Sequence, residues 1–349
     1  MGTIWYCLVA VMIAVYVLLD GFDLGAGSIH FLIARSSEER RQVIATIGPV
    51  WDGNEVWLLA AGGTLYFAFP ALYASSFSGF YLPLMIVLWL LILRGTAVEF
   101  RNQIQSPIWI PFWDFVFSAA SLLLVVFYGA ALGNVVRGVP LDESGYFFEP
   151  LWTNFRLGEH TGILDWFTIL AGVLALLALM MHGALWVQLK TQGELGERAR
   201  NVAGISWWAV LAVTAVVTAL TFGVQPQVLA NFHTWPAGYV LPVIAIAGLA
   251  GVQFELRRNN QLNAFLASCV YLLGMLTSVV FGVYPMVLPA RNPAFSLTVR
   301  SAKAADYGLK VGLIWWFIGM ALATVYFVYV YRSFAGKIAE SPDAHAHGE

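Results

Sequence analysis

Long apolar segments recur along the whole chain and constrain its fold more than any other feature of the sequence. Nine mainly apolar segments follow one another, at residues 3–28, 50–73, 77–98, 114–136, 162–188, 204–224, 236–256, 262–288 and 310–331. A helix of roughly 20 apolar residues is long enough to cross the hydrocarbon core of a bilayer. The sequence therefore predicts an all-α integral membrane protein with about nine transmembrane helices.

The composition agrees with a membrane protein. Hydrophobic residues make up 60% of the chain and charged residues only 11%, whereas soluble domains carry about 25% charged residues. A net charge of −2 argues against nucleic acid as a partner. Cys7 and Cys269 lie in apolar segments and give neither a disulfide framework nor a Cys-x-x-Cys metal site. Residues 4–19 lack a basic leader and a cleavage site, so we expect them to form the first span.

Positive charge predicts the orientation of the helices, because cytoplasmic loops carry an excess of Lys and Arg. We expect the N-terminus outside and the C-terminus in the cytoplasm. With that start, the inner connections hold Arg35, Arg40, Arg41, Arg94, Arg101, Lys190, Arg198, Arg200, Arg257, Arg258, Arg332 and Lys337, and the outer ones hold Arg137, Arg156, Arg291, Arg300, Lys303 and Lys310. The outer loop 289–309 is unusually basic for this orientation, and a partner surface is one explanation.

A weak internal repeat predicts the organisation of the chain. Glu38 and Arg41 after the first span match Glu197 and Arg200 after the fifth, which indicates two four-helix units plus one extra helix. The predicted parts are a first unit at 1–136, an external loop at 137–161, a second unit at 162–288, an external loop at 289–309, a ninth helix at 310–332 and a polar cytoplasmic tail at 333–349. The loop 137–161 carries the acidic residues Asp142, Glu143, Glu149 and Glu159.

Four carboxylates lie at the ends of the first two spans. Asp20 and Asp23 close the first span, and Asp52 and Glu55 open the second with the same spacing of three. Residues three apart share one face of a helix, so we expect all four at one membrane level, with Arg94 as their counter-charge. A buried carboxylate is costly unless it is paired, solvated or used. Crowded carboxylates in a low dielectric take up protons more readily, which indicates proton handling.

Structural roles are the alternative for each of these residues. Asp52 is a candidate N-cap for the second span, with Glu55 completing a capping box. The other acids would then pair with Arg94 and the basic inner loop. Proton exchange and helix capping both remain open at this point.

Two tryptophans and two glycines in the second span also have structural interpretations. Trp51 and Trp57 are typical of the aromatic residues found at membrane interfaces. Gly62 and Gly63 are expected to permit close packing of neighbouring helices.

The histidines bear on whether the chain holds a haem, which needs His, Met or Cys ligands projecting into a bundle. His182 alone lies well inside a predicted span, and a lone buried histidine is usually a hydrogen-bonded core residue. The others are His30, His160, His233, His345 and His347, at boundaries, in outer regions or in the tail. We therefore expect no haem and no metal bound by this chain alone. The absence of a Gly-rich nucleotide loop argues against a primary pump.

Several short motifs in the first hundred residues closely resemble subunit II of the cytochrome bd-type quinol oxidases. They are DGFDLG at 20–25, WDGNEVWL at 51–58, AGG at 61–63, the FP and YA steps at 69–70 and 73–74, FSGFY at 77–81, RG at 94–95 and EFR at 99–101. The remainder of the chain agrees with this family in length, helix count and orientation.

The resemblance implies the subunit of a bacterial or archaeal respiratory enzyme that reduces dioxygen to water with electrons from a membrane quinol. Haems b and d would be bound by a haem-bearing subunit I, and this chain would be its haem-free scaffold partner, associated with lipid. Small single-span subunits and a structural quinone occur in some relatives. The resemblance also implies that Asp52 lies on a cytoplasmic proton route, with Asp20, Asp23 and Glu55 nearby. Trp57 would lie beside an oxygen path.

Two other functions fit parts of the sequence. Nine spans with membrane-embedded acids also suit a secondary transporter or a proton-conducting channel, which would not need the motif strings. A pure scaffold subunit without a proton role is the third hypothesis. Substitution of Asp52 distinguishes it from an oxidase subunit that conducts protons.

Overall fold

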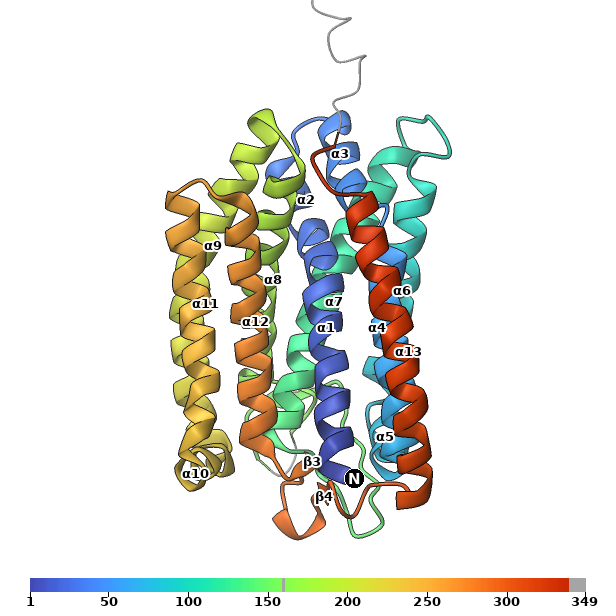
Figure 1. Cartoon of the computed structure of the whole chain (residues 1–349), viewed down its shortest axis with the longest axis vertical. Coiled ribbons are helices and arrows are strands. Elements are labelled where there is room, and N and C mark those ends of the chain that lie inside the picture. The colour runs from blue at the N-terminus through green and yellow to red at the C-terminus, as the bar shows by residue number, and fades with distance from the viewer. Residues whose placement is uncertain (159–160, 339–349) are drawn as a thin grey trace, which may run out of the picture.

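The computed structural model describes residues 1–158 and 161–338 as a bundle of long helices (Figure 1). The helices are α1 (Gly2–Ser28), α2 (His30–Ile33), α3 (Ser37–Ile47), α4 (Trp51–Ala68), α5 (Pro70–Gly79), α6 (Tyr81–Phe100), α7 (Trp109–Arg137), α8 (Trp166–Lys190), α9 (Gly193–Val224), α10 (Pro226–Thr234), α11 (Val240–Arg257), α12 (Gln261–Val283) and α13 (Asp306–Ser333). Short 3-10 turns span Pro236–Tyr239 and Pro293–Phe295. Four residues named above, Glu159, His160, His345 and His347, and most of the predicted tail lie outside the described residues.

Strand β1 (Trp152–Phe155) pairs in parallel with β2 (Leu164–Asp165), and β3 (Met286–Leu288) pairs antiparallel with β4 (Leu297–Thr298). Strands β3 and β4 lie at the end of the bundle where the chain begins (Figure 1). We call this the N-terminal end of the bundle, and the opposite end, where α3 lies, the α3 end. The chain starts at the N-terminal end, and α13 finishes at the α3 end.

Eight helical segments of the described chain are long and apolar enough to cross a membrane. This finding confirms the predicted all-α membrane fold. The difference from nine predicted spans falls on 50–73, whose helix α4 has 18 residues and carries Asp52, Asn54 and Glu55 in its first turns. Helix α4 nevertheless packs against α1 within the bundle.

The chain breaks where the sequence predicted a continuous second span. Helix α4 ends at Ala68, Phe69 leaves the helical conformation with φ −134° and ψ 65°, and α5 starts at Pro70. A proline disfavours the helical conformation for the residue before it and has no N–H to continue the ladder. Pro70 is therefore the physical reason why the predicted span 50–73 is two helices.

Two other predicted boundaries also shift. Helix α9 begins at Gly193 rather than near residue 204, so a polar first part extends it beyond the apolar segment. The apolar segment predicted from residue 236 begins with a 3-10 turn, Pro236–Tyr239, and α11 continues from Val240. Hydropathy alone marks the apolar part of a helix and does not detect polar helical turns beyond it.

Glycines allow α1 and α8 to touch through their backbones. A Cβ atom placed on Gly25 would lie 2.9 Å from the Gly183 Cα atom, which is closer than side-chain carbons approach. Small residues in such positions let membrane helices pack tightly. Gly62 and Gly63 do not serve this purpose, because a Cβ atom on either would meet nothing within 4 Å. The predicted packing role is therefore wrong for those two residues within the described chain.

Ion pairs tie the loops of the N-terminal end together. Arg137 binds Asp165 and also donates to Glu149 at 2.7 Å, while Arg291 binds the same glutamate. Lys303 pairs with Asp306 at 2.5 Å. Burial raises the pKa of Glu149, although the two arginines oppose that effect. Part of the basic charge in the loop 289–309 is thus used within the chain.

Candidate functional site

Arg94 on α6 joins two carboxylates from two other helices near the α3 end of the bundle. Its guanidinium donates to Asp20 of α1 at 2.6 Å and to Glu55 of α4 at 2.7 Å. Arg94 is 1% exposed and Asp20 is fully buried. Three helices that alternate in direction bring their polar turns to one level, which confirms the expected meeting of these residues.

Asp23 lies one turn further along α1 and is also fully buried. One of its oxygens accepts a 2.8 Å hydrogen bond from the Asn54 side chain of α4. Asn54 in turn accepts a 2.8 Å hydrogen bond from the hydroxyl of Tyr331 near the end of α13. The second Asp23 oxygen, Oδ1, has no hydrogen-bond partner within the described residues.

The charges of this group do not balance. We call Asp20, Asp23, Glu55 and Arg94 the carboxylate cluster. Within the described chain, Arg94 is the one cation that forms salt bridges with these acids. Buried charges are tolerated when they are paired and hydrogen-bonded, so an uncompensated carboxylate favours its neutral, protonated form. Three acids therefore share one cation within the described chain.

Asp52 does not join the cluster. Its side chain is exposed in the first turn of α4, and Val50 is the N-cap residue without a side-chain capping bond. The structural alternative of an Asp52 N-cap is therefore wrong. Asp52 lies in the same first turns of α4 as Glu55, but its side chain is outside the group around Arg94. The rotation of α4 about its axis places Glu55 inward and Asp52 outward.

Trp57 is buried at 8% exposure in a small apolar cluster of its own with Met12, Tyr16 and Ala61. Its ring lies 5.5 Å from the ring of Phe327 on α13. The indole Nε1 has no hydrogen-bond partner within the described residues. These surroundings are apolar and internal to the bundle, which differs from the interfacial position that a boundary tryptophan would take.

A second buried polar group lies at the α3 end and was not predicted. Asp114 on α7 is fully buried and accepts hydrogen bonds from Arg101 at 2.5 Å and Arg40 at 2.9 Å. His30 lies 3.2 Å from the same carboxylate. Cations outnumber acids here, so this group needs no additional proton and is a structural tie between α2, α3, α6 and α7.

The chain's intramembrane histidine does not fit a haem. One ring nitrogen of His182 lies 2.7 Å from the Ser268 hydroxyl, and the other donates to the Leu18 carbonyl at 3.0 Å. The ring also stacks on Phe265 at 4.8 Å. Since an axial ligand needs a free nitrogen, His182 is the hydrogen-bonded core residue that the sequence indicated.

An apolar pocket of about 280 Å³ opens between α1, α7, α8, α9 and α12. Tyr16 and Tyr128 lie on its wall, and their hydroxyls are 3.0 Å apart. Nearly all of the remaining lining is aliphatic or aromatic. The pocket is suited to an apolar chain with a small polar group at one end.

Fold and site together define a multi-pass membrane protein that buries ionisable groups in its helical bundle. The family model described as cytochrome bd terminal oxidase subunit II matches residues 1–334, and the chain belongs to that family. It is therefore a subunit of an oxygen-reducing oxidase in respiratory electron transport. A cytochrome complex contains haem, and a subunit II has a subunit I as its partner.

Individual relatives agree with this assignment. The probable cytochrome oxidase subunit 2 of Haemophilus influenzae is 31% identical over 362 residues, which cover 96% of this chain and 94% of the relative. The cytochrome bd ubiquinol oxidase subunit 2 of Bacillus subtilis is 34% identical over 319 residues, with 88% of each chain covered. The bd oxidase structure from Geobacillus thermodenitrificans has the same fold, with a TM-score of 0.75, 14% identity and coverage of 95% of this chain and 98% of that chain.

Sequence reasoning missed Asn54 and Tyr331 as members of the site. Asn54 stands inside the motif string, so its position alone was a usable signal. Tyr331 is separated from Asn54 by 277 residues, and nothing in its local sequence indicates the contact.

Proposed function

We propose that this chain takes up protons from the cytoplasm for the reduction of dioxygen by a membrane quinol in its complex. The haems b and d would be bound by subunit I, and this chain would form the haem-free half of the core. The observation that carries the proposal is the surplus of buried carboxylates around Arg94. A group of this kind binds and releases protons without redox chemistry of its own.

Asp52 would be the outer member of this route. It is exposed and precedes Glu55 by three residues on α4, so the two side chains lie within one turn of each other. A proton accepted by Asp52 from water would pass to Glu55, whose carboxylate bonds Arg94. Asp20 and Asp23 would then carry protons further into the bundle.

The orientation that this route needs has the α3 end in the cytoplasm of a bacterial or archaeal cell. The excess of Lys and Arg in the connections at that end supports it. The N-terminus would lie outside, and the C-terminus would lie in the cytoplasm.

For Trp57 we propose a place beside the path by which oxygen reaches the partner's haem. The support is its apolar surroundings, since dioxygen is nonpolar and favours such regions. The neighbouring Met12, Ala61 and Phe327 offer no charged group.

A structural quinone is a further proposed component of the complex. The pocket lined by Tyr16 and Tyr128 supports it, because its apolar wall suits an isoprenoid chain and its hydroxyls suit a carbonyl oxygen. Extraction of the purified complex and chromatography would detect the quinone, and Leu132→Trp, which fills the pocket, should reduce its amount.

Substitution of Asp23 by Asn tests the proton role. The amide keeps the shape of the carboxyl and a hydrogen bond to Asn54, but it cannot exchange a proton. If the group contributes the typical ~10²–10⁴-fold of a positioned acid or base, oxygen consumption per haem with saturating quinol should fall steeply. The matched control is Glu99→Gln, an exposed carboxyl at the same end of the bundle.

This comparison also addresses the scaffold reading. A fully assembled Asp23→Asn complex with parental turnover would favour a subunit that holds the complex together and moves no protons. Membership of the oxidase family argues against the transporter alternative.

A further inference from the structure

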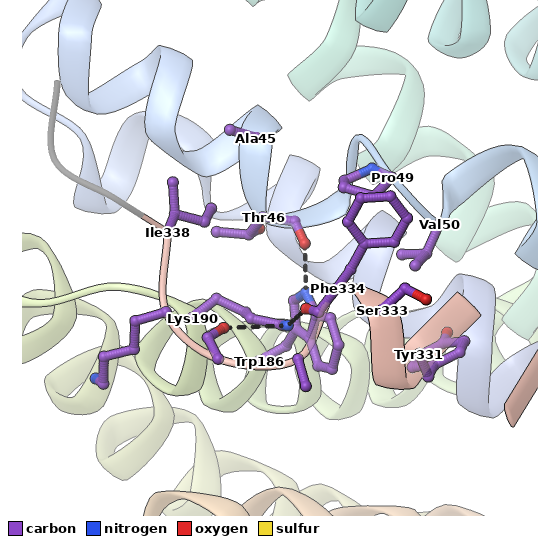
Figure 2. Close-up of a pocket in the computed structure, with 13 residues that line it drawn as sticks. Ala45, Thr46, Pro49, Val50, Trp186, Lys190, Tyr331, Ser333, Phe334 and Ile338 are labelled. Carbon is purple, nitrogen blue, oxygen red and sulfur yellow. Dashed lines mark hydrogen bonds between the residues drawn. The ribbon is translucent and has the colours of Figure 1, made fainter. Parts of the chain in front are cut away.

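A second pocket, of about 250 Å³, lies at the α3 end beside the last turn of α13 (Figure 2). Its wall is formed by Ala45, Thr46, Pro49 and Val50 around the end of α3, by Trp186 and Lys190 of α8, by Tyr331 and Ser333 of α13, and by residues 334–338. We call residues 334–338 the strap. The pocket is separate from the apolar pocket, and no lining residue is shared between them.

The strap is fixed to α8 by reciprocal bonds. The Lys190 ammonium donates to the Phe334 carbonyl at 2.6 Å and to the Gly336 carbonyl at 3.3 Å. In return, Lys337 donates to the Thr191 carbonyl at 2.5 Å, and the Ile338 amide donates to the Lys190 carbonyl at 2.9 Å. The lysines satisfy carbonyl groups at the ends of two helices. The outer wall of the pocket is therefore a built part of the fold.

The pocket has the size and chemistry to hold water. A water molecule occupies about 30 Å³ in the liquid and needs two to four polar partners. The Lys190 ammonium and the strap backbone supply polar groups along the wall. The Ser333 hydroxyl donates instead to the Tyr329 carbonyl at 2.9 Å within α13. Several water molecules would fit the volume of about 250 Å³.

Tyr331 links this pocket to the carboxylate cluster. It lines the pocket, and its hydroxyl donates to the side-chain oxygen Oδ1 of Asn54 at 2.8 Å. Asn54 donates to Asp23 at 2.8 Å. Two side chains thus separate the pocket from Asp23, whose Oδ1 oxygen is buried and has no partner within the described residues.

We propose that the strap pocket is a water-filled proton inlet to Asp23, with Tyr331 as its gate. While Tyr331 bonds Asn54, the inlet is closed. When the hydroxyl turns away and releases the Asn54 side chain, pocket water reaches the free Oδ1 oxygen of Asp23. A hydronium ion then gives its proton to the carboxylate, which leaves one water molecule and a neutral carboxyl. This route is distinct from Asp52, and the inference rests on the proposed proton role of the cluster.

Plugging the pocket with a thiol reagent tests the inlet in the assembled complex. Ser333→Cys places a thiol on the pocket wall, and Gln192→Cys places one at an exposed position of the same end outside the pocket. Both are made with Cys7→Ser, because Cys7 is exposed. Before labelling, both complexes should turn over like the parent.

After complete modification with a trimethylammonium-ethyl methanethiosulfonate, turnover per haem should fall at least several-fold in Ser333→Cys and stay unchanged in Gln192→Cys. Mass spectrometry measures the extent of modification. Parental turnover in fully modified Ser333→Cys would overturn the inlet. If Asp23→Asn lowers turnover in the same series, the proton role survives that result. If Asp23→Asn also turns over normally, both proposals fail.

A second measurement does not depend on turnover. The infrared carbonyl band of the Asp23 carboxyl, identified by its loss in Asp23→Asn, shifts when the complex is moved into D₂O. This exchange should become several-fold slower in modified Ser333→Cys and several-fold faster in Tyr331→Phe, which lacks the gating hydroxyl but keeps the ring. Equal exchange rates in the parent and both variants would contradict the gate as well as the inlet.

Discussion

The Arg94 guanidinium donates a 2.6 Å hydrogen bond to Asp20, although 74 residues separate the two in the sequence. Both side chains are buried, so water would not solvate either charge if its partner were removed. Removing one partner of a buried ion pair leaves an uncompensated charge, which costs about 3–5 kcal/mol. The pair therefore makes a stability contribution that is separate from proton transfer.

Replacement of Arg94 by Ala should lower the stability of the complex by about 3–5 kcal/mol. Thermal unfolding of the purified complex, followed through its haem spectrum, measures the effect as a lower Tm. The control is Arg332→Ala, because Arg332 is exposed at the end of α13. Equal Tm values for the two variants would show that the surrounding helices compensate for the lost pair.

His182→Gln should leave the haem content of the complex unchanged. Both imidazole nitrogens are engaged within the chain, so no haem ligand is removed. The lost hydrogen bonds should cost about 1–3 kcal/mol of stability. Haem is measured per complex by the pyridine haemochrome spectrum, and the stoichiometric loss of one haem from an assembled complex would contradict the assignment.

Reporter fusions should place the two ends of the chain on opposite sides of the membrane. Helix α1 starts at the N-terminal end and α13 finishes at the α3 end, so an odd number of crossings connects them (Figure 1). A reporter fused after Glu349 should be active in the cytoplasm, and one inserted at 142–149 should be active outside. Activity on the same side would mean that one of the helices between residue 149 and the C-terminus does not cross the bilayer.

Much of the site follows from periodicity and alternation. Asp20 and Glu55 could be placed at one level because each closes or opens an apolar segment, and Arg94 comes at the matching end of the third. The outward position of Asp52 could not be predicted, since the rotation of α4 depends on its packing against α1 and α13. The contact of Tyr331 with Asn54 could not be predicted either, because a contact across 277 residues leaves no local pattern in the sequence.

The fold was predictable to a similar degree. Apolar segments of bilayer length identify helices reliably, because the backbone must satisfy its own hydrogen bonds in lipid. The break at Pro70 was also accessible, since proline restricts the residue before it. The strap was not, because its position depends on bonds between Lys190, Lys337 and distant carbonyl groups.

Ala60→Phe should raise the apparent KM for oxygen several-fold and leave kcat at saturating oxygen unchanged. Ala60 is partly buried beside Trp57, so a larger ring would narrow the proposed oxygen path without touching the carboxylate cluster. Oxygen consumption measured over a range of oxygen concentrations separates the two parameters. Leu59→Phe is the control, because Leu59 is 72% exposed. An unchanged KM in Ala60→Phe would remove Trp57 from the oxygen route.

Asp52→Asn should reduce turnover while leaving assembly intact. Asp52 is exposed and does not cap α4, so the amide should cost little stability. Loss of its exchangeable proton should slow proton uptake by up to the ~10²–10⁴-fold of a positioned acid or base, or by only several-fold if the strap pocket supplies Asp23 in parallel.

The measurement is oxygen consumption per haem with saturating quinol, made on the single variant and on Asp52→Asn combined with modified Ser333→Cys. Two parallel routes predict that the combined loss exceeds the product of the separate losses, because in each single variant the intact route still supplies protons. A combined loss no greater than the larger of the two separate losses would indicate a single route, in which Asp52 and the strap pocket act in series. Parental turnover in an assembled Asp52→Asn complex would remove Asp52 from proton uptake altogether.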